Sequence, residues 1–240
     1  MKNWFDTWFN TPYYHLLYKD RNMDEAEFFL KNLLNHLMPN KDDKFLDIAC
    51  GKGRHAIFIN KMGYNIEGID LSKESIQYAN SFTNNKLNFN VHDMRNYYKK
   101  DEFDVVLNIF TSFGYFDNPG DNLKAIQAMS DNLKKGGKII LDFMNAKKVV
   151  NELVTSELKT VENIDFNIKR SYENGYIFKD IYFTDTEEYH FQEKVQALFL
   201  SDFIDLFEKS DLKIINLWGD YSLNDFNTIH SPRLIILAQK

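Results

Sequence analysis

The fold of this chain is decided by residues 44–56, which have the sequence KFLDIACGKGRHA. The first part, residues 45–49, is a short apolar run typical of a buried strand in a parallel sheet. Gly51 and Gly53 follow and predict a tight turn, and residues 54–62 have the spacing of a helix. A strand, a glycine-rich turn and a helix in this order form the first unit of a ligand-binding α/β sheet.

The same alternation of strand and helix continues toward the C-terminus. Ser72 is expected to cap one helix, and residues 121–133 are expected to form another that Gly136 ends. Such alternation predicts a doubly wound, mostly parallel, Rossmann-like sheet with helices on both faces. The further strands are expected at residues 65–70, 87–91, 103–110 and 138–143.

Residues 151–200 break this rhythm. Apolar and polar residues alternate there, and Asn174-Gly175 is a strong hairpin signal, so we predict an antiparallel β insertion of about three strands after the fifth strand. Ser201 is then expected to cap a helix that runs to Lys209. Two final strands are expected at residues 214–218 and 234–238.

The predicted organisation is one sheet domain with two additions. Residues 41–150 and 201–240 form the domain, and residues 151–200 are an insertion within it. Residues 1–40 hold an irregular aromatic segment, which includes Trp4 and Phe5, followed by a helix over 24–38. This segment could clamp the sheet edge or form a lid over a ligand, and the insertion could serve as a dimerisation surface or as a pocket wall.

The composition limits the class of protein. The chain has 240 residues, of which 44% are hydrophobic and 27% charged, as in ordinary globular proteins, and its net charge of −6 argues against a nucleic-acid partner. The single cysteine, Cys50, excludes an internal disulfide and fits a reducing, cytoplasmic setting. We expect no membrane span, because no run of about eighteen apolar residues occurs. We also expect no metal, because the six histidines lack the spacing of metal ligands.

The glycine-rich turn carries the chemistry. Residues 51–56 formally match G-x-G-x-x-A, a dinucleotide fingerprint that keeps an NAD-linked oxidoreductase as an alternative. Asp47 argues against it, because a carboxylate near the turn repels a pyrophosphate and favours a cationic ligand.

S-adenosylmethionine is such a ligand, and the chain resembles the class I S-adenosylmethionine-dependent methyltransferases over about residues 40–145. The first motif of that family is matched by an acidic residue and a glycine-rich turn, the second by Asp70 and the third by Asp93. The residues that the resemblance places at the cofactor are Asp47, Ala49, Cys50, Gly51, Gly53, Arg54, Asp70, Leu71, Asp93, Met94 and Asn108.

The resemblance also implies a role for each group. Asp47 and the turn around Gly51 and Gly53 would hold the methionine end, with Arg54 near its carboxylate. Asp70 would hold the ribose, Asp93 and Met94 the adenine, and the backbone near Asn108 the ammonium. Plainer interpretations stay open: Asp70 could cap the next helix, Asp93 could be a turn residue, and Cys50 could be a small residue in a tight loop.

The predicted function is methyl transfer to a small-molecule acceptor. A base is needed only if the acceptor must lose a proton, and the candidates are His15, Tyr14 and Tyr115. A cofactor-binding module without catalysis is a second alternative, because the binding half can persist without chemistry. The sequence does not identify the acceptor.

Overall fold

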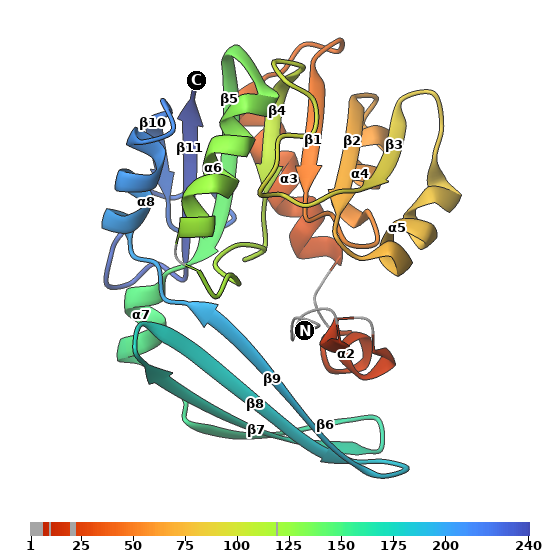
Figure 1. The fold of residues 1–240 in the computed structure, drawn as a ribbon, viewed down its shortest axis with the longest axis vertical. Coiled ribbons are helices and arrows are strands. Elements are labelled where there is room, and N and C mark those ends of the chain that lie inside the picture. Colours follow the sequence, from red (N-terminus) through yellow and green to blue (C-terminus); the bar gives the residue numbers. More distant parts are fainter. Residues whose placement is uncertain (1–6, 10, 20–22, 119) are drawn as a thin grey trace.

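A computed structural model describes residues 7–9, 11–19, 23–118 and 120–240 (Figure 1). In these residues, seven strands form a central sheet in the order β10-β11-β5-β4-β1-β2-β3. Five neighbouring strands, in the order β5-β4-β1-β2-β3, pair in parallel. Strand β11 runs antiparallel to both β5 and β10. The predicted doubly wound, mostly parallel sheet is therefore confirmed. The strands are β1 (Lys44–Ile48), β2 (Asn65–Asp70), β3 (Leu87–Val91), β4 (Phe103–Asn108), β5 (Leu133–Met144), β10 (Lys213–Trp218) and β11 (Arg233–Gln239).

Helices cover both faces of this sheet (Figure 1). One apolar core contains Phe29, Ile59 and Ile76, and the other contains Ile126 and Phe203. Alternate residues of the strands contribute to the two cores, as expected for a strand that is buried on both faces. The first core is covered by α3 (Met23–Leu37), α4 (Arg54–Lys61) and α5 (Lys73–Ala79), and the second by α6 (Gly120–Asn132), α7 (Ala146–Asn151) and α8 (Leu200–Glu208).

The predicted insertion is a separate antiparallel sheet. It has four strands within the described residues, rather than about three, in the order β6-β7-β8-β9. Asn174-Gly175 joins β7 to β8, with Glu173 opposite Tyr176. The additional strand is β6, which the sequence pattern missed because its side chains are mostly exposed. The strands are β6 (Ser156–Val161), β7 (Ile164–Glu173), β8 (Tyr176–Thr184) and β9 (Glu188–Gln196).

The N-terminal segment packs on this second sheet. It was expected to be irregular, but it contains a short helix, α2 (Pro12–Leu17), whose Leu17 joins Trp8, Phe166 and Ile181 in a third apolar core. Trp4 and Phe5, which belong to the same aromatic stretch, lie outside the described residues.

Three element boundaries differ by two residues or more from the predicted ones. Strand β4 ends at Asn108, two residues before its predicted end. Strand β5 begins at Leu133, five residues early, because residues that follow α6 directly already pair with β4. Helix α8 begins after Phe199, whose N–H donates to the Asp202 carboxylate at 2.7 Å, so Ser201 lies in the first turn and does not cap the helix. The predicted cap at Ser72 is confirmed, because its hydroxyl accepts the N–H of Ser75 at 3.1 Å.

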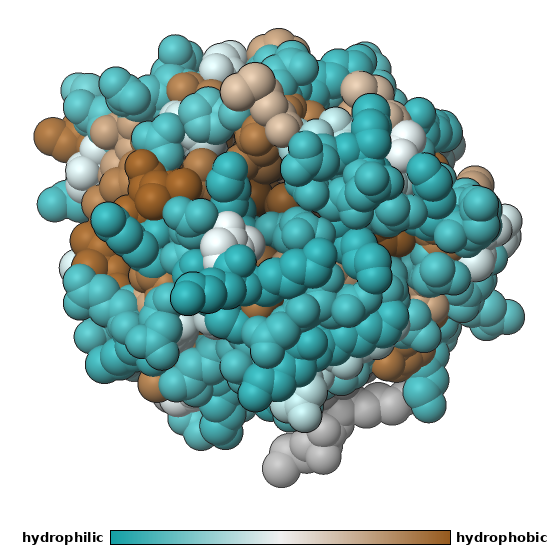
Figure 2. Space-filling view, turned by 90° about the horizontal axis from the view of Figure 1, so that it is seen from above, coloured by the Kyte–Doolittle hydropathy of each residue, from teal (hydrophilic) through white to brown (hydrophobic). Residues whose placement is uncertain are grey.

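The surface opposite the second sheet is mostly hydrophilic, with apolar side chains gathered in patches toward one side (Figure 2). None of the helices in the described residues is long and apolar enough to cross a membrane.

Gly53 fits its position for two reasons. Its φ of +81° lies in the left-handed region, and an added Cβ would come within 2.6 Å of the Phe89 ring. The close approach of the turn to β3 therefore depends on the missing side chain.

We expect Gly53→Ala to cost more free energy of unfolding than Gly175→Ala, by about 1–3 kcal/mol. Gly175 is a matched control, because it has the same φ of +81° and no atom within 4 Å of an added Cβ. Urea unfolding of the two variants measures the difference. If both variants lost the same free energy of unfolding, the Phe89 ring would have to move aside without destabilising the protein.

Candidate functional site

A cavity of about 540 Å³ lies at the carboxyl ends of the parallel strands. Its walls come from the segments that follow β1, β2, β3 and β4, including the turn between β1 and α4. The sheet order reverses between β1 and β4, and this is the place where open α/β sheets bind ligands. Five residues of the N-terminal segment close the cavity from the other side: Phe9, Tyr14, His15, Tyr18 and Lys19.

Asp70 links two of these segments. One carboxylate oxygen accepts the N–H of Gly51 and the other accepts the N–H of Ser72, both at 2.8 Å. Burial raises the pKa of Asp70, and the backbone N–H groups of Ser72, Gly51 and Leu71 oppose that rise. Asp70 also lines the cavity. It therefore has two roles: its hydrogen bond to Ser72 holds the start of the next helix in place, and its side chain faces the site.

Asp47 is buried behind the wall. Its side chain is 1% exposed, and its Oδ2 atom has no hydrogen-bond partner. Burial raises its pKa to about 7, the neighbouring Asp70 adds to the rise, and Arg54 opposes it. The nearest histidine nitrogen is Nδ1 of His55 at 3.9 Å, but burial lowers the pKa of His55 to about 3, so the two do not form an ion pair at neutral pH.

Asn108 occupies a similar position at the end of β4. Its Nδ2 donates to the carbonyl of Ile48 at 3.1 Å, and its Oδ1 has no partner. Three of the predicted cofactor residues do not line the cavity: Asp47, Gly53 and Asn108. All the other predicted cofactor residues do line it. Two buried oxygens without donors therefore lie just behind the turn.

Asp93 is fixed by a neighbour that the sequence analysis did not single out for it. Its carboxylate accepts Nε of Arg95 at 3.0 and 3.1 Å and Nη2 at 2.6 Å, while Nη1 of Arg95 reaches Asp121 at 2.9 Å. The Arg95 hydrogen bonds hold the pKa of Asp93 below its usual range. Asp93 is thus an ionised, oriented carboxylate on the wall, beside Met94.

The three candidate bases also line the cavity. The Tyr115 hydroxyl donates to the carbonyl of Thr111. The ring of Tyr14 lies 4.9 Å from that of Phe9 and 5.4 Å from that of His15. Burial lowers the pKa of His15, and the positive charge of Lys52 lowers it further.

A family model described as a methyltransferase domain matches residues 39–196. The chain belongs to the methyltransferase domain family. Family and fold are those of the class I S-adenosylmethionine-dependent methyltransferases, which confirms the resemblance found in the sequence.

Two curated relatives are similar over part of the methyltransferase. A glycine/sarcosine N-methyltransferase from Aphanothece halophytica is 28% identical over 137 residues, 55% of this chain and 50% of the relative. A dTDP-3-amino-3,4,6-trideoxy-alpha-D-glucopyranose N,N-dimethyltransferase from Streptomyces venezuelae is 25% identical over 54% of each chain. The chain thus spans about half the length of the curated relatives that it matches.

Solved structures match the methyltransferase over nearly its whole length. An S-adenosylmethionine-dependent methyltransferase from Clostridium acetobutylicum has a TM-score of 0.79 at 21% identity and covers 95% of both chains. The amino pentose methyltransferase CalS10 from Micromonospora echinaspora, solved with S-adenosylmethionine bound, has a TM-score of 0.74 at 16% identity, over 95% of this chain and 97% of its own. At these identities the likeness shows the fold.

The residues at the methyltransferase cavity fit a cationic cofactor. Asp47 and Asn108 place buried oxygens without donors behind the turn, and burial raises the pKa of both Asp47 and Asp70. A nearby positive charge would lower the free energy of both carboxylates. In the described part of the chain, no group of three or more histidine, cysteine or acidic residues could hold a metal ion.

We expect Asp47→Asn to stabilise the ligand-free protein progressively as the pH is raised from 4 to 8. The folded-state pKa of Asp47 is raised from 3.8 to about 7, so its destabilising effect is absent at low pH and complete above pH 7. The gain at pH 8 should be on the order of a few kcal/mol. Urea unfolding at several pH values measures it, and a gain that does not change with pH would contradict this origin.

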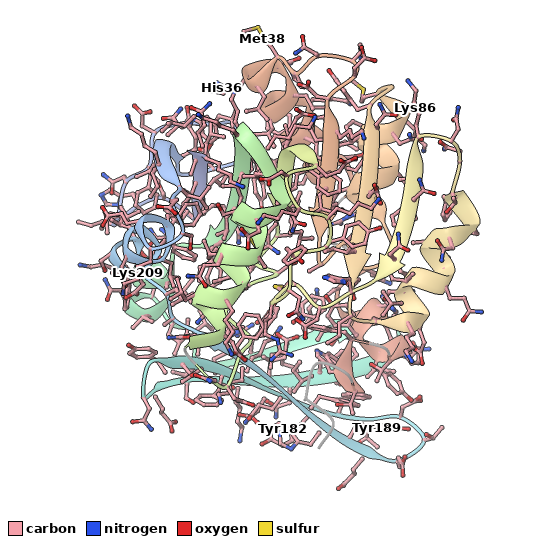
Figure 3. All side chains as sticks on the ribbon, turned by 45° about the horizontal axis from the view of Figure 1, so that its top comes forward. His36, Met38, Lys86, Tyr182, Tyr189 and Lys209 are labelled. Carbon is pink, nitrogen blue, oxygen red and sulfur yellow. The ribbon has the colours of Figure 1, made fainter. Side chains whose placement is uncertain are left out.

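We expect the pKa of His15 to lie below 6.5 and to rise in Lys52→Gln, because that variant removes the second cause of the shift. Burial, the first cause, is unchanged, so the pKa should stay below 6.5 even in the variant. Histidine NMR titration measures it, with His15→Gln to assign the resonance. Lys86→Gln is the control, because Lys86 lies at the end of the molecule opposite the second sheet (Figure 3). A pKa that does not respond to Lys52→Gln would remove this electrostatic link.

Proposed function

We propose that this methyltransferase transfers the sulfonium methyl group of S-adenosylmethionine to a small-molecule acceptor. The observation that carries the proposal is the set of acidic residues at the carboxyl ends of successive strands: Asp70 and Asp93 line the cavity, and Asp47 is buried behind its wall. The bound cofactor would supply a methyl group on a positively charged sulfur. When the lone pair of the acceptor attacks the methyl carbon, the carbon–sulfur bond breaks and the sulfur leaves with the electron pair of that bond.

Different residues of the cavity contact different parts of the cofactor. Asp70 accepts hydrogen bonds from the ribose hydroxyls, and Asp93 and Met94 contact the adenine. Arg54 and the turn through Gly51 hold the methionine end together with its carboxylate. Asp47 does not touch the cofactor but stabilises its positive charge from behind the wall, and Ala49, Cys50 and Leu71 complete the wall.

We propose an amine as the acceptor. The two curated relatives are named as N-methyltransferases, of glycine or sarcosine and of an amino sugar nucleotide. The acceptor end of the cavity is lined by aromatic rings, including those of Phe9, Tyr14 and Tyr115, and these exclude water from the attacking nitrogen.

His15 is the base that fits an amine. An ammonium group must lose its proton before its nitrogen can attack, and a histidine whose pKa is lowered is ready to accept that proton at neutral pH. Tyr14 and Tyr115 then shape the acceptor site. A homodimer through the second sheet and a cytoplasmic location stay predictions of the sequence.

The first test is thermal unfolding with S-adenosylmethionine, S-adenosylhomocysteine, NAD and NADP in turn. A ligand that binds only the native state raises the midpoint. We expect a rise with the first two, and a rise with NAD alone would favour the oxidoreductase. Formation of S-adenosylhomocysteine is then measured with glycine, sarcosine and amino sugars. Cofactor binding without turnover of any panel member would favour the binding module.

We expect Asp70→Asn to weaken S-adenosylhomocysteine binding by about tenfold or more, because the ribose loses a charged acceptor. Isothermal titration calorimetry measures the affinity. Asp131→Asn, which changes an exposed aspartate on α6, is the control and should bind normally. Unchanged affinity in the Asp70 variant would remove the ribose role.

A further inference from the structure

A buried ion pair lies behind the part of the cavity wall that follows β4. Nε of Arg233, on β11, donates to Oδ1 of Asp142, on β5, at 2.8 Å. The Asp142 side chain is 0% exposed and that of Arg233 is 18% exposed. Burying two charges costs several kcal/mol of desolvation, and apolar side chains would stabilise the junction of the two strands at least as well.

The pair is bonded to the turn that follows β4. The N–H of Phe110 donates to Oδ2 of Asp142 at 2.7 Å, and the N–H of Thr111 donates to the Asp142 main-chain carbonyl at 3.0 Å. Nη2 of Arg233 donates to the Thr111 hydroxyl at 2.8 Å. Three hydrogen bonds thus hold two consecutive residues to the ion pair.

Those two residues have a backbone conformation that their side chains disfavour. Phe110 and Thr111 both have a φ of +60°, in the left-handed region that suits glycine. Such residues persist where surrounding bonds outweigh the strain, and they are concentrated at active sites. The hydrogen bonds from Asp142 and Arg233 supply that restraint.

The restrained turn shapes the cavity wall. The Phe110 ring stacks on His55, with centroids 4.9 Å apart and an 11° angle between planes, and the Arg54 guanidinium lies 5.0 Å from its centroid. The Tyr115 hydroxyl donates to the Thr111 carbonyl. The position of Tyr115, and that of the ring beside Arg54, therefore follow from the position of this turn.

We propose that Asp142 and Arg233 are positioning residues for methyl transfer, which act through Thr111 on Phe110 and Tyr115. The pair holds the wall that carries Phe110 and Tyr115 in one arrangement, and neither Asp142 nor Arg233 lines the cavity itself. The catalytic part of this inference rests on the proposed function, because it assumes that the acceptor lies against this wall.

The test compares Thr111→Val with Thr111→Ser. Valine keeps the branched shape and removes the bond to Arg233, whereas serine keeps the hydroxyl. In Thr111→Val we expect hydrogen exchange of the peptide covering residues 109–116 to rise by about tenfold, and in Thr111→Ser to stay near that of the wild type. S-adenosylhomocysteine affinity should stay within about threefold in both variants.

Turnover of the best acceptor in the amine panel separates positioning from stability. In Thr111→Val, kcat should fall by about tenfold or more while KM for S-adenosylmethionine is unchanged, and Thr111→Ser should restore kcat. Arg233→Lys is the second variant if valine prevents folding. A lysine preserves the charge opposite Asp142 but lacks the fork that also reaches Thr111, so it should behave like the valine variant.

Two outcomes would overturn the inference: equal hydrogen exchange over residues 109–116 in the valine variant and the wild type, or equal kcat in the valine and serine variants. Failure of the proposed function is recognised separately, because the wild type would then bind no S-adenosylhomocysteine or would turn over no member of the amine panel. The hydrogen-exchange comparison needs no ligand and would still decide whether the ion pair restrains the turn.

Discussion

Parallel pairing of the five neighbouring strands β5, β4, β1, β2 and β3 is the constraint on which the rest of the structure depends. Since parallel strands all end at the same edge, the segments that follow them must meet there. Asp70 and Asp93 come from different parts of the chain and line one cavity for this reason, and Asp47 lies behind its wall. The glycine-rich turn can join them because Gly53 has no side chain to strike Phe89.

That gathering leaves the ligand-free site electrostatically incomplete. Burial raises the pKa of Asp47 and Asp70 and lowers that of His55, and Asp47 and Asn108 each keep an oxygen without a donor. A protein selected for stability alone would not retain such groups. A positively charged ligand is the partner that these groups lack, so the same residues that weaken the empty protein would strengthen the complex.

The insertion holds in place the N-terminal segment that lines the cavity. Nε1 of Trp8 and the Tyr18 hydroxyl both donate to Oε1 of Glu193, on β9, at 2.7 and 2.6 Å. Tyr13 packs on Tyr189 of the same sheet, with ring centroids 4.8 Å apart. The segment clamps onto the second sheet, not the edge of the main one, and it also lines the cavity. The clamp and the lid that the sequence offered as alternatives are therefore compatible.

The sequence by itself determined the fold and the order of the acidic motifs, because hydrophobic period and glycine position are local properties that a single chain displays. It could not reveal the Asp142–Arg233 pair, whose members are 91 residues apart and meet only through the antiparallel register of β5 and β11. Nor could it show the left-handed turn at Phe110 and Thr111, since neither residue type favours that conformation. Asp47 and Asn108 behind the wall, and Arg95 clamping Asp93, were likewise decided by tertiary packing, which sets what each side chain can reach.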